Sequence, residues 1–444
     1  MSTTKFGSPM PPADERSSSD TLLEAAVKAA ARLAISAIYP ACEVLFSPPR
    51  ADVSGPPPAR RILVIQRDFL GDVLFTTPML RALRARYPEA RIDVLVRPHG
   101  QEALAGNPHV DAVHVEGTAL TRRDRLGEYV GFWRLALRLR RQRYDLVFDL
   151  TKGKAFAHAL LTALTGAPIR VGIQTWERAG FVWRHGFPLC HNVEVPTRPN
   201  QHLIDYFLDT VRILGAEAKD RRMELQFDDS DRAHVADVLH ALGAAEHRPL
   251  VVIHPGANRL QNRMAPDRVA RLCADLWMRH RARVILIGVP AERSRLEGIA
   301  AQIPDPRPSL VVDLSLRQLA ALLERCDLFL SGDSGPLRIA DIAGAPMVSW
   351  FGSANPANTR PLGDACLVLT PPLTCCPCYE FTVQAERAFE RCPVRCIDLI
   401  PLEEILSAAA SQLRVGRAAG RPTLGDGGGR AVAALRASPT WDRP

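Results

Sequence analysis

A chain of 444 residues is long enough for two or three domains and for a sizeable buried core. Its content of 47% hydrophobic and 23% charged residues is typical of a globular protein and excludes a disordered or fibrous chain. The formal net charge of +8 favours anionic partners such as nucleotide phosphates, phosphorylated glycans or a membrane surface. Aromatic residues make up only 6% of the chain and do not interleave with a basic block, which argues against nucleic acid as a partner.

Residues 1–60 form an N-terminal extension, with a predicted helix over 21–46 and a Pro-rich linker over 47–60. Thr21 and Glu24 fit a capping box at the start of that helix. Charged residues interrupt its apolar stretch and its leader is acidic and Ser-rich, so the helix is neither a membrane span nor a signal peptide. It either packs on the body of the protein or attaches to a membrane surface. We therefore expect a cytoplasmic protein, and peripheral contact with the inner face of the membrane stays open.

Apolar runs typical of buried parallel strands alternate with helical patterns in two successive series. A polar, charged break at 216–248 separates the two series. This pattern predicts an α/β protein with two doubly wound, Rossmann-like domains, 61–225 and 245–413, which face one another across a central cleft, and a disordered tail over 414–444. Ligands are expected at the carboxyl ends of the strands. The expected strands are 62–66, 92–96, 112–115, 145–150, 169–173, 250–256, 283–288, 310–314, 327–333, 346–352 and 366–370.

The first strand is followed by the turn "RDFLGD" and a helical stretch, which places Asp72 at a helix N-terminus and at the carboxyl end of a strand. Asp is among the best helix-capping residues, so a cap is one interpretation. The turn contains only Gly71 and lacks the G-x-G-x-x-G pattern of a dinucleotide site, and a carboxylate would repel a phosphate. The other interpretation of Asp72 is therefore a general base.

The second series has two turns suited to an anion. "HPGANRLQNRM" (254–264) follows a buried strand and offers Arg259 and Arg263. "SGDSGPLRIADIAGAP" (331–346) enters a helix whose first N–H groups, with the Ser334 hydroxyl, form a natural phosphate seat. Arg338 lies one turn inside that helix and can reach the same anion. Each turn alone also fits simple capping, but the pair, facing a base candidate, favours a nucleotide site.

Several stretches in the same order resemble glycosyltransferase family 9, the group of the ADP-heptose:lipopolysaccharide heptosyltransferases. They are "GDVLFTTPMLRALRARYP", "NPHVDAVH", "GAPIRVGI", "HPGA", "GDSGPLRIADIAGAPMVSWFGSANP" and the late cysteine cluster, and the resemblance covers about residues 60–410. It implies a GT-B fold with the acceptor on the N-terminal domain and the nucleotide sugar on the C-terminal domain. It also implies inverting transfer without a covalent intermediate, with Asp72 as the base.

The resemblance and the charge pattern together assign a donor site to the C-terminal domain. Cationic and N–H groups there would stabilise the departing diphosphate, and Asp333 would orient the ribose or the loop. The chain departs from the family where Asn262 and Met264 replace a Lys and a Trp, and where Arg338 replaces a frequent His. An arginine fork suits phosphate and can compensate for the lost lysine. The predicted donor-binding residues are Arg259, Asn262, Arg263, Glu292, Asp333, Ser334, Gly335 and Arg338.

No cofactor is required by this chemistry. The acidic stretch "DDSD" (228–231) is interpreted as a helix cap rather than a metal-binding pair. Five cysteines crowd into 375–396 and leave three states open, namely a structural zinc, a disulfide and packed free thiols. The predicted zinc ligands are Cys375, Cys378, Cys392 and Cys396.

The sequence therefore predicts an inverting glycosyltransferase that moves a sugar, a heptose, from a nucleoside diphosphate donor to a lipopolysaccharide core or a related surface glycan. Two alternatives remain, a non-catalytic nucleotide-sugar-binding relative and a GT-B nucleotide-sugar epimerase. His202 is interpreted as a helix-capping or packing residue. The basic amphipathic helix expected over 122–145 either presents a solvated face or contacts a phosphorylated acceptor or anionic lipid headgroups.

Overall fold

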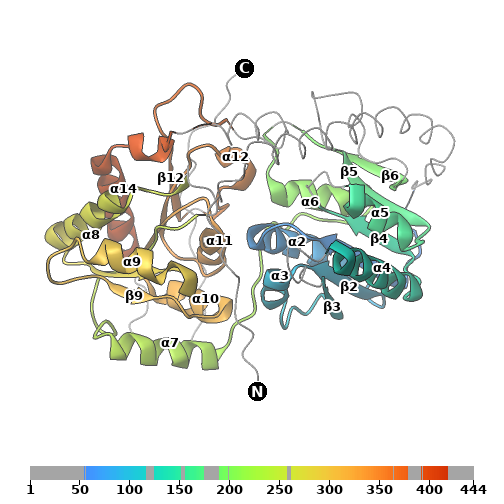
Figure 1. Cartoon of the computed structure of the whole chain (residues 1–444), viewed down its shortest axis with the longest axis horizontal. Coiled ribbons are helices and arrows are strands. Elements are labelled where there is room, and N and C mark those ends of the chain that lie inside the picture. The colour runs from blue at the N-terminus through green and yellow to red at the C-terminus, as the bar shows by residue number, and fades with distance from the viewer. Residues whose placement is uncertain are drawn as a thin grey trace.

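The computed structural model describes residues 55, 57–116, 125–151, 156–174, 190–198, 200–257, 262–363, 365–378, 392 and 394–418. The predicted N-terminal helix and nearly all of the tail lie outside these ranges. Two α/β domains stand side by side, each built on a parallel sheet with helices on both faces (Figure 1). No helix within the described ranges is long and apolar enough to cross a bilayer.

The N-terminal domain contains a six-stranded sheet in the order β3-β2-β1-β4-β5-β6. Apolar runs in the sequence predicted five of these strands. In three of the five, β1, β2 and β4, the run is buried. The sequence reading missed β6, a short edge strand with a charged Glu194 and a terminal Pro196, which carries no continuous apolar run. The strands are β1 (Arg61–Gln66), β2 (Arg91–Val96), β3 (Ala112–Val115), β4 (Leu146–Asp149), β5 (Ile169–Gln174) and β6 (Val193–Pro196).

Helices cover both faces of this sheet. Helices α4 and α5 pack on one face over Leu63, Val147 and their neighbours, whereas α2 and α6 pack together on the other. Figure 1 shows α4 on the outer side of the N-terminal domain and α2 on the side that faces the C-terminal domain. The helices are α2 (Leu70–Arg86), α3 (Pro98–Ala103), α4 (Arg125–Arg141), α5 (Phe156–Leu164) and α6 (Leu203–Arg212).

The C-terminal domain repeats the plan, and its sheet has the order β12-β11-β10-β7-β8-β9. Each of its six strands overlaps a predicted run, although β9 shares only Leu310 and Val311 with the run predicted over 310–314. They are β7 (Leu250–His254), β8 (Arg283–Ile287), β9 (Ser309–Val311), β10 (Leu328–Gly332), β11 (Met347–Trp350) and β12 (Cys366–Leu369). Its helices are α8 (Pro266–His280), α9 (Arg293–Ala300), α10 (Leu316–Arg325), α11 (Gly335–Ile342), α12 (Pro356–Thr359) and α14 (Leu402–Ala418), so α14 runs beyond the domain end expected at residue 413.

Helix α7 (Asp229–Ala241) lies in the connection between the domains and packs on α10. Asp228 caps it by accepting hydrogen bonds from the N–H groups of Ser230 and Asp231. Arg317 of α10 also pairs with Asp228 and Asp231. The acidic stretch 228–231 is thus a capping and ion-pairing element, as its sequence indicated.

Both sheets change direction at an equivalent place. The first strand of each series, β1 or β7, lies beside the fourth, β4 or β10, and the chain winds outward from there on each side. Doubly wound domains bind ligands at the carboxyl ends of two such diverging strands. The turn that carries Asp72 follows β1, and the two predicted donor turns follow β7 and β10.

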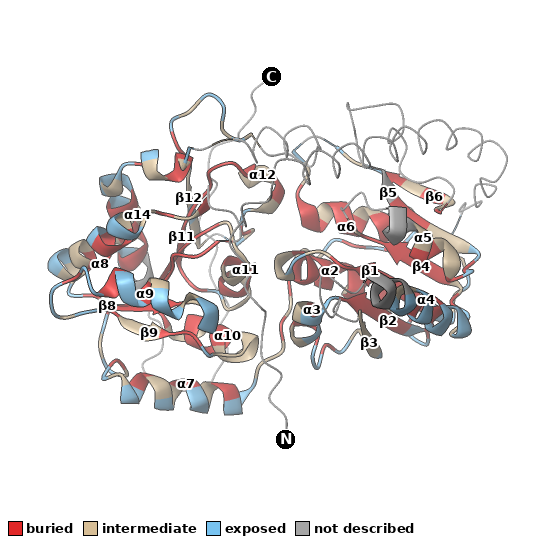
Figure 2. Cartoon of the chain, in the orientation of Figure 1, coloured by how far each residue is buried: buried red, intermediate tan, exposed pale blue. Residues whose placement is uncertain are grey.

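Burial of the central strands on both faces explains why they form at all. Figure 2 shows the two sheets as buried cores and the exposed residues on the outer helices. The strand residues Ile62, Val64, Val252 and Phe329 are fully buried. Each such side chain contributes about 1.5–3 kcal/mol by leaving water, which offsets the conformational entropy of ordering the strands.

Candidate active site

Asp72 lies in the first turn of α2, just past the end of β1. The helix begins after Phe69, and the Phe69 N–H donates to Asp72 Oδ2 at 3.2 Å. Asp72 therefore does contribute to the helix start, although it is the third residue of the helix rather than the cap itself. Asp72 is only 6% exposed. This hydrogen bond fixes the orientation of the carboxylate at the strand end. Both a helix-capping residue and a general base need such a fixed orientation.

Other acidic side chains lie at the same edge of the N-terminal sheet. Asp149 ends β4 and accepts from Thr162 Oγ1 at 3.0 Å and from His191 Nε2 at 3.2 Å. Burial alone would raise the pKa of Asp149, but these hydrogen bonds and the His191 charge outweigh burial and lower it. Tyr206 is buried near Asp68, Asp149 and Asp72, and burial followed by these charges raises its pKa. This edge is thus rich in carboxylates.

In the C-terminal domain, His254 ends β7 beside the turn that starts α11. Its Nδ1 lies 3.2 Å from Ser334 Oγ and 3.4 Å from Ser331 Oγ, and the two hydroxyls are 2.9 Å apart. Burial lowers the pKa of His254 to about 4, so the imidazole is neutral near pH 7. Ser334 occupies the N-cap position of α11, yet its hydroxyl makes no capping bond. The hydroxyl belongs to this polar cluster instead.

Glu292 fills the space between the turns after β7 and β8. A Cβ on Gly256 would come within 2.8 Å of Glu292 Oε1 and of His254 Nε2, and a Cβ on Gly288 within 2.9 Å of Glu292 Oε2. Arg295 Nη2 donates to Glu292 Oε1 at 2.6 Å. The two glycines therefore leave room for an ion pair past the ends of β7 and β8, in contact with the His254 cluster.

Arg338 links the two domains. Its guanidinium pairs with Asp333 and lies 4.9 Å from the centre of the Phe75 ring on α2. The Arg338 side chain is only 3% exposed, and its Nη1 has no hydrogen-bond partner within the described part of the chain. Since a buried guanidinium N–H without a partner is costly, this nitrogen is suited to an anion that enters the interface.

The helix start that carries Asp72 packs against the predicted donor turn. A Cβ on Gly71 would lie 3.7 Å from Arg338 Cγ, and a Cβ on Gly335 would lie 3.1 Å from Leu70 Cδ2. The start of α2 and the start of α11 therefore pack against one another, each at a glycine. Asp72, one residue from Gly71, lies beside the turn predicted to hold the donor.

A second set of contacts joins the domains between residues 200–202 and the α12 region. Asn355 Nδ2 donates to Asn200 Oδ1 at 2.7 Å, and Asn358 Nδ2 donates to the Gln201 carbonyl at 2.9 Å. The His202 Nδ1 accepts from the Ile204 N–H, so its Nε2 carries the proton and donates to the Arg360 carbonyl at 2.9 Å. The capping role predicted for His202 is confirmed, and the interdomain hydrogen bond adds to it.

The remaining predicted donor residues take several positions. Arg259 lies outside the described residues. Arg263 is half-buried, its Nε donates to the Ala257 carbonyl, and burial lowers its pKa. Asn262 is buried and its Oδ1 accepts from Ser353 Oγ at 3.1 Å. Asp333 accepts from Arg338 and from Thr359 Oγ1.

The late cysteines gather near residue 352. Cys396 Sγ would be 2.9 Å from a Cβ on Gly352, and the Cys378 N–H donates to the Ser353 carbonyl at 3.1 Å. Burial and the neighbouring thiols raise the pKa values of Cys376 and Cys378. Cys375, Cys376, Cys378 and Cys396 are free thiols, and the described ranges hold no group of three or more His, Cys, Asp or Glu arranged for a metal.

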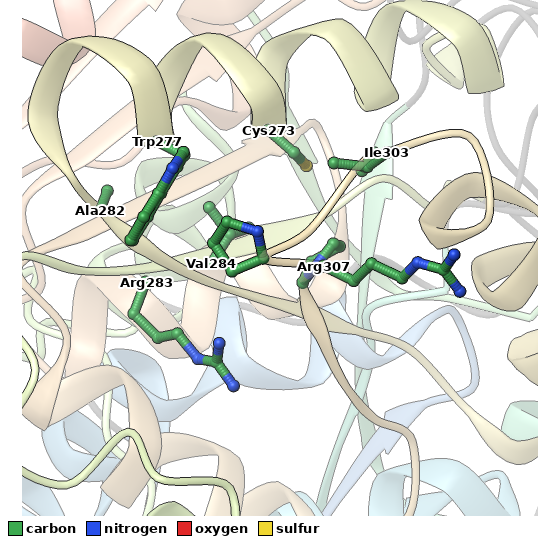
Figure 3. A pocket seen from close by; sticks show the side chains of 9 residues that line it. Cys273, Trp277, Ala282, Arg283, Val284, Ile303 and Arg307 are labelled. Atoms are coloured by element: carbon green, nitrogen blue, oxygen red, sulfur yellow. The ribbon is translucent and has the colours of Figure 1, made fainter.

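A shallow pocket opens elsewhere, between α8, β8 and the turn before β9 (Figure 3). Figure 3 shows the Trp277 ring and the Cys273 thiol on one side and the side chains of Arg283 and Arg307 on the other. No carboxylate lines it, and burial raises the pKa of Cys273 to about 12, so that thiol is not a nucleophile near pH 7. This pocket is a poor candidate for catalysis.

Two residues of the site, His254 and Phe75, were not predicted from the sequence. His254 ends an apolar strand and Phe75 lies in an apolar helix, so both are typical of core residues in the sequence. The "HPG" sequence directly after a buried strand was the available signal for His254. No local signal marks Phe75, because its partner Arg338 belongs to the other domain.

Comparison with known proteins agrees with this geometry. The family model of glycosyltransferase family 9 (heptosyltransferase) matches residues 132–388. Lipopolysaccharide heptosyltransferase 3 of Escherichia coli is 25% identical over 295 residues, which cover 66% of this chain and 84% of the relative. Lipopolysaccharide heptosyltransferase 2 of E. coli K12 is 23% identical over 324 residues, 70% of this chain and 87% of the relative.

Solved structures show the same fold. The glycosyltransferase of family 9 from Veillonella parvula superposes with a TM-score of 0.65 at 22% identity, covering 80% of this chain and 98% of the other. The E. coli ADP-heptose lipopolysaccharide heptosyltransferase II gives a TM-score of 0.61 at 20% identity, covering 80% and 99%. The family match extends over more than half of the chain and the fold is GT-B. The chain therefore belongs to glycosyltransferase family 9, the heptosyltransferase family, and is a glycosyltransferase.

Proposed function

We propose that this enzyme transfers a heptose from a nucleoside diphosphate donor to a lipopolysaccharide core or a related surface glycan, with inversion at the anomeric carbon. The names of the relatives support the sugar and the acceptor class. The observation that carries the mechanism is the contact between the start of α2, which bears Asp72, and the start of α11. This contact supports a base on one domain and a donor on the other.

In the proposed reaction Asp72 removes the proton from an acceptor hydroxyl. The hydroxyl oxygen forms a bond to the anomeric carbon while the bond from that carbon to the diphosphate oxygen breaks. General-base catalysis of this kind contributes about 10²–10⁴-fold. The hydrogen bond from the Phe69 N–H holds the Asp72 carboxylate in place at the end of β1.

The departing diphosphate gains negative charge, so the donor side must supply positive charge and hydrogen-bond donors. The buried Nη1 of Arg338 supports such a role, because no described residue satisfies it. The Ser334 hydroxyl, with the neutral His254 behind it, supplies a further donor. Arg263 and the Glu292–Arg295 pair border the neighbouring turn after β7, at Gly256 and Ala257.

The proposed reaction calls on no cofactor, and the structural zinc at the cysteine cluster stays a prediction. Neither of the two alternatives to transfer gains support. A pure binding protein has no need of a buried carboxylate beside the donor turn, and an epimerase needs several acid and base groups around one sugar. Since a lipopolysaccharide-like acceptor is membrane-bound, we place the enzyme at the cytoplasmic face of the inner membrane.

The first experiment measures thermal stabilisation of the full chain by ADP, GDP, UDP and dTDP and by the corresponding sugar nucleotides. A ligand that binds only the folded protein raises the melting temperature with its concentration. We expect ADP and ADP-heptose to stabilise the protein, and transfer to heptose-deficient lipopolysaccharide to follow by mass spectrometry. Stabilisation by another nucleotide alone would overturn the ADP-heptose donor, and donor hydrolysis or epimerisation without transfer would overturn the acceptor class.

A further inference from the structure

Helix α4 carries an exposed apolar stripe. Val130, Trp133 and Leu137 are 39%, 50% and 52% exposed. They stand three and four residues apart, so they lie along one face of the helix. Among the described residues, nine large hydrophobic side chains are exposed, and three of them belong to this one helix. Single exposed apolar residues are normal, but a continuous stripe marks an interaction surface.

Arginines flank the stripe. Arg134, Arg138 and Arg141 are exposed on the same side of α4, and residues 130–141 contain no acidic residue. None of these three arginines forms an ion pair within the described part of the chain. The positive charge of this face is therefore not neutralised by the described residues around it.

The opposite face of α4 anchors the helix firmly. Leu135, Ala136 and Leu139 are buried in the core cluster with Leu63 and Val147 of the sheet. Figure 1 shows α4 on the side of the N-terminal domain away from the C-terminal domain, and Figure 2 colours much of its surface as exposed. The stripe is thus a fixed, outward surface rather than one that closure of the two domains would cover.

We propose that this face of α4 docks the enzyme on an anionic bilayer, with the helix axis in the plane of the membrane. Trp133 and Leu137 enter the interfacial region, where tryptophan is enriched, while the arginines bind lipid phosphates. Charge complementarity selects the occupant, because an apolar stripe beside arginines and without acidic residues matches anionic headgroups over acyl chains. The inference deepens the membrane location proposed above and does not depend on the donor sugar.

The test is co-sedimentation of the purified full chain with vesicles of phosphatidylcholine alone or with added phosphatidylglycerol. Both kinds of vesicle lack glycolipid, so binding cannot reflect the sugar acceptor. We expect binding to the anionic vesicles and little to the neutral ones. The triple variant Arg134→Gln, Arg138→Gln, Arg141→Gln should lower the partition coefficient by roughly tenfold or more. The double variant Trp133→Ser, Leu137→Ser should lower it severalfold, including at high salt.

The matched control is Met278→Ser with Arg271→Gln on α8, which removes an exposed apolar side chain and an arginine from the C-terminal domain. It should bind as the wild type does. Undiminished vesicle binding by both α4 variants would overturn the proposal, and so would a change from dimer to monomer caused by Trp133→Ser, Leu137→Ser. Nucleotide stabilisation, measured on the same variants, should be unchanged, which separates failure of this inference from failure of the proposed transfer.

Discussion

Past the ends of β1 and β4 the N-terminal sheet carries carboxylates, whereas past the ends of β7 and β10 the C-terminal sheet carries hydroxyls, an imidazole and guanidinium groups. The carboxylates of the second edge, Glu292 and Asp333, are each paired with an arginine. Asp72 and Asp149 represent the first set, and Ser334, His254 and Arg338 the second. The strand order is the same in both sheets. Topology therefore places the two sites, and only the side chains at the strand ends make them different.

The difference fits two halves of one reaction. Carboxylates accept a proton but repel a phosphate, while serine, arginine and helix N–H groups do the reverse. The two edges meet where Phe75 and Leu70 of α2 contact Arg338 and Gly335 of α11. Under the proposed mechanism, a domain pair built in this way separates the base from the leaving group and still keeps them within one interface.

The largest expected effect is that of Asp72→Asn, which removes the proposed base from the N-terminal edge. Turnover should fall by about 10²–10⁴-fold, whereas the donor Kd should change little because the donor edge is intact. Steady-state kinetics and donor titration measure the two quantities. If the variant keeps the wild-type kcat, Asp72 only supports the helix start. If it unfolds, Asp72→Ser repeats the test, because its hydroxyl can still accept from the Phe69 N–H but is not a base.

The next effect concerns Arg338→Met, which removes the guanidinium from the interface. The donor Kd should rise by about tenfold to a hundredfold, because a hydrogen bond to a charged group is worth about 1.5–3 kcal/mol. Asp333 would also lose its partner, so unfolding without ligand must be measured alongside. Arg338→Lys keeps the charge and should give an intermediate Kd. An unchanged Kd in both variants would remove Arg338 from the donor site.

A smaller change tests the glycine at the donor edge. Gly256→Ala brings a Cβ within 2.8 Å of Glu292 Oε1 and His254 Nε2, which should destabilise the fold by up to about 3 kcal/mol and weaken donor binding severalfold. Gly298→Ala is the matched control, since a Cβ there meets nothing and its helical position should gain about 0.5–1 kcal/mol. Equal stability and donor affinity in the two variants would contradict the packing described around Glu292.

The smallest effect is pH-dependent and concerns His202. Burial lowers its folded pKa to about 3, below the unfolded value near 6.5. The stabilisation of the fold by neutral His202 is therefore complete above about pH 6.5 and is lost as the pH falls toward 3. The loss reaches about 2 kcal/mol at pH 5. His202→Asn keeps a capping side chain and should lose less stability than the wild type between about pH 7.5 and 5 in denaturant titrations. Parallel losses in the two proteins would show that His202 is not buried in its neutral form.

The fold was largely predictable because it rests on local, continuous patterns. Eleven of the described strands fall on predicted apolar runs, which are buried in the central strands and half-buried in β3, β9 and β12, and the missed strand β6 has no such run. Asp72 and the turn at 333–335 were found because a strand end followed by a polar turn and a helix is also a local pattern. Contacts between domains do not follow from local patterns. No stretch of sequence therefore predicts the Arg338 contact with the Phe75 ring or the hydrogen bond from His202 to the Arg360 carbonyl. The direction of Asn262, whose Oδ1 accepts from Ser353, likewise depends on a distant loop.

The most direct measurement is amide hydrogen exchange of the full chain with and without ADP. If the donor binds to the C-terminal domain, ADP should slow exchange in peptides containing 254–257 and 332–338. Peptides of the first four strands, including the edge near Asp149, should exchange at the same rate in both states. Slowed exchange confined to the N-terminal domain would contradict the account, since it would place the nucleotide at the carboxylate-lined edge.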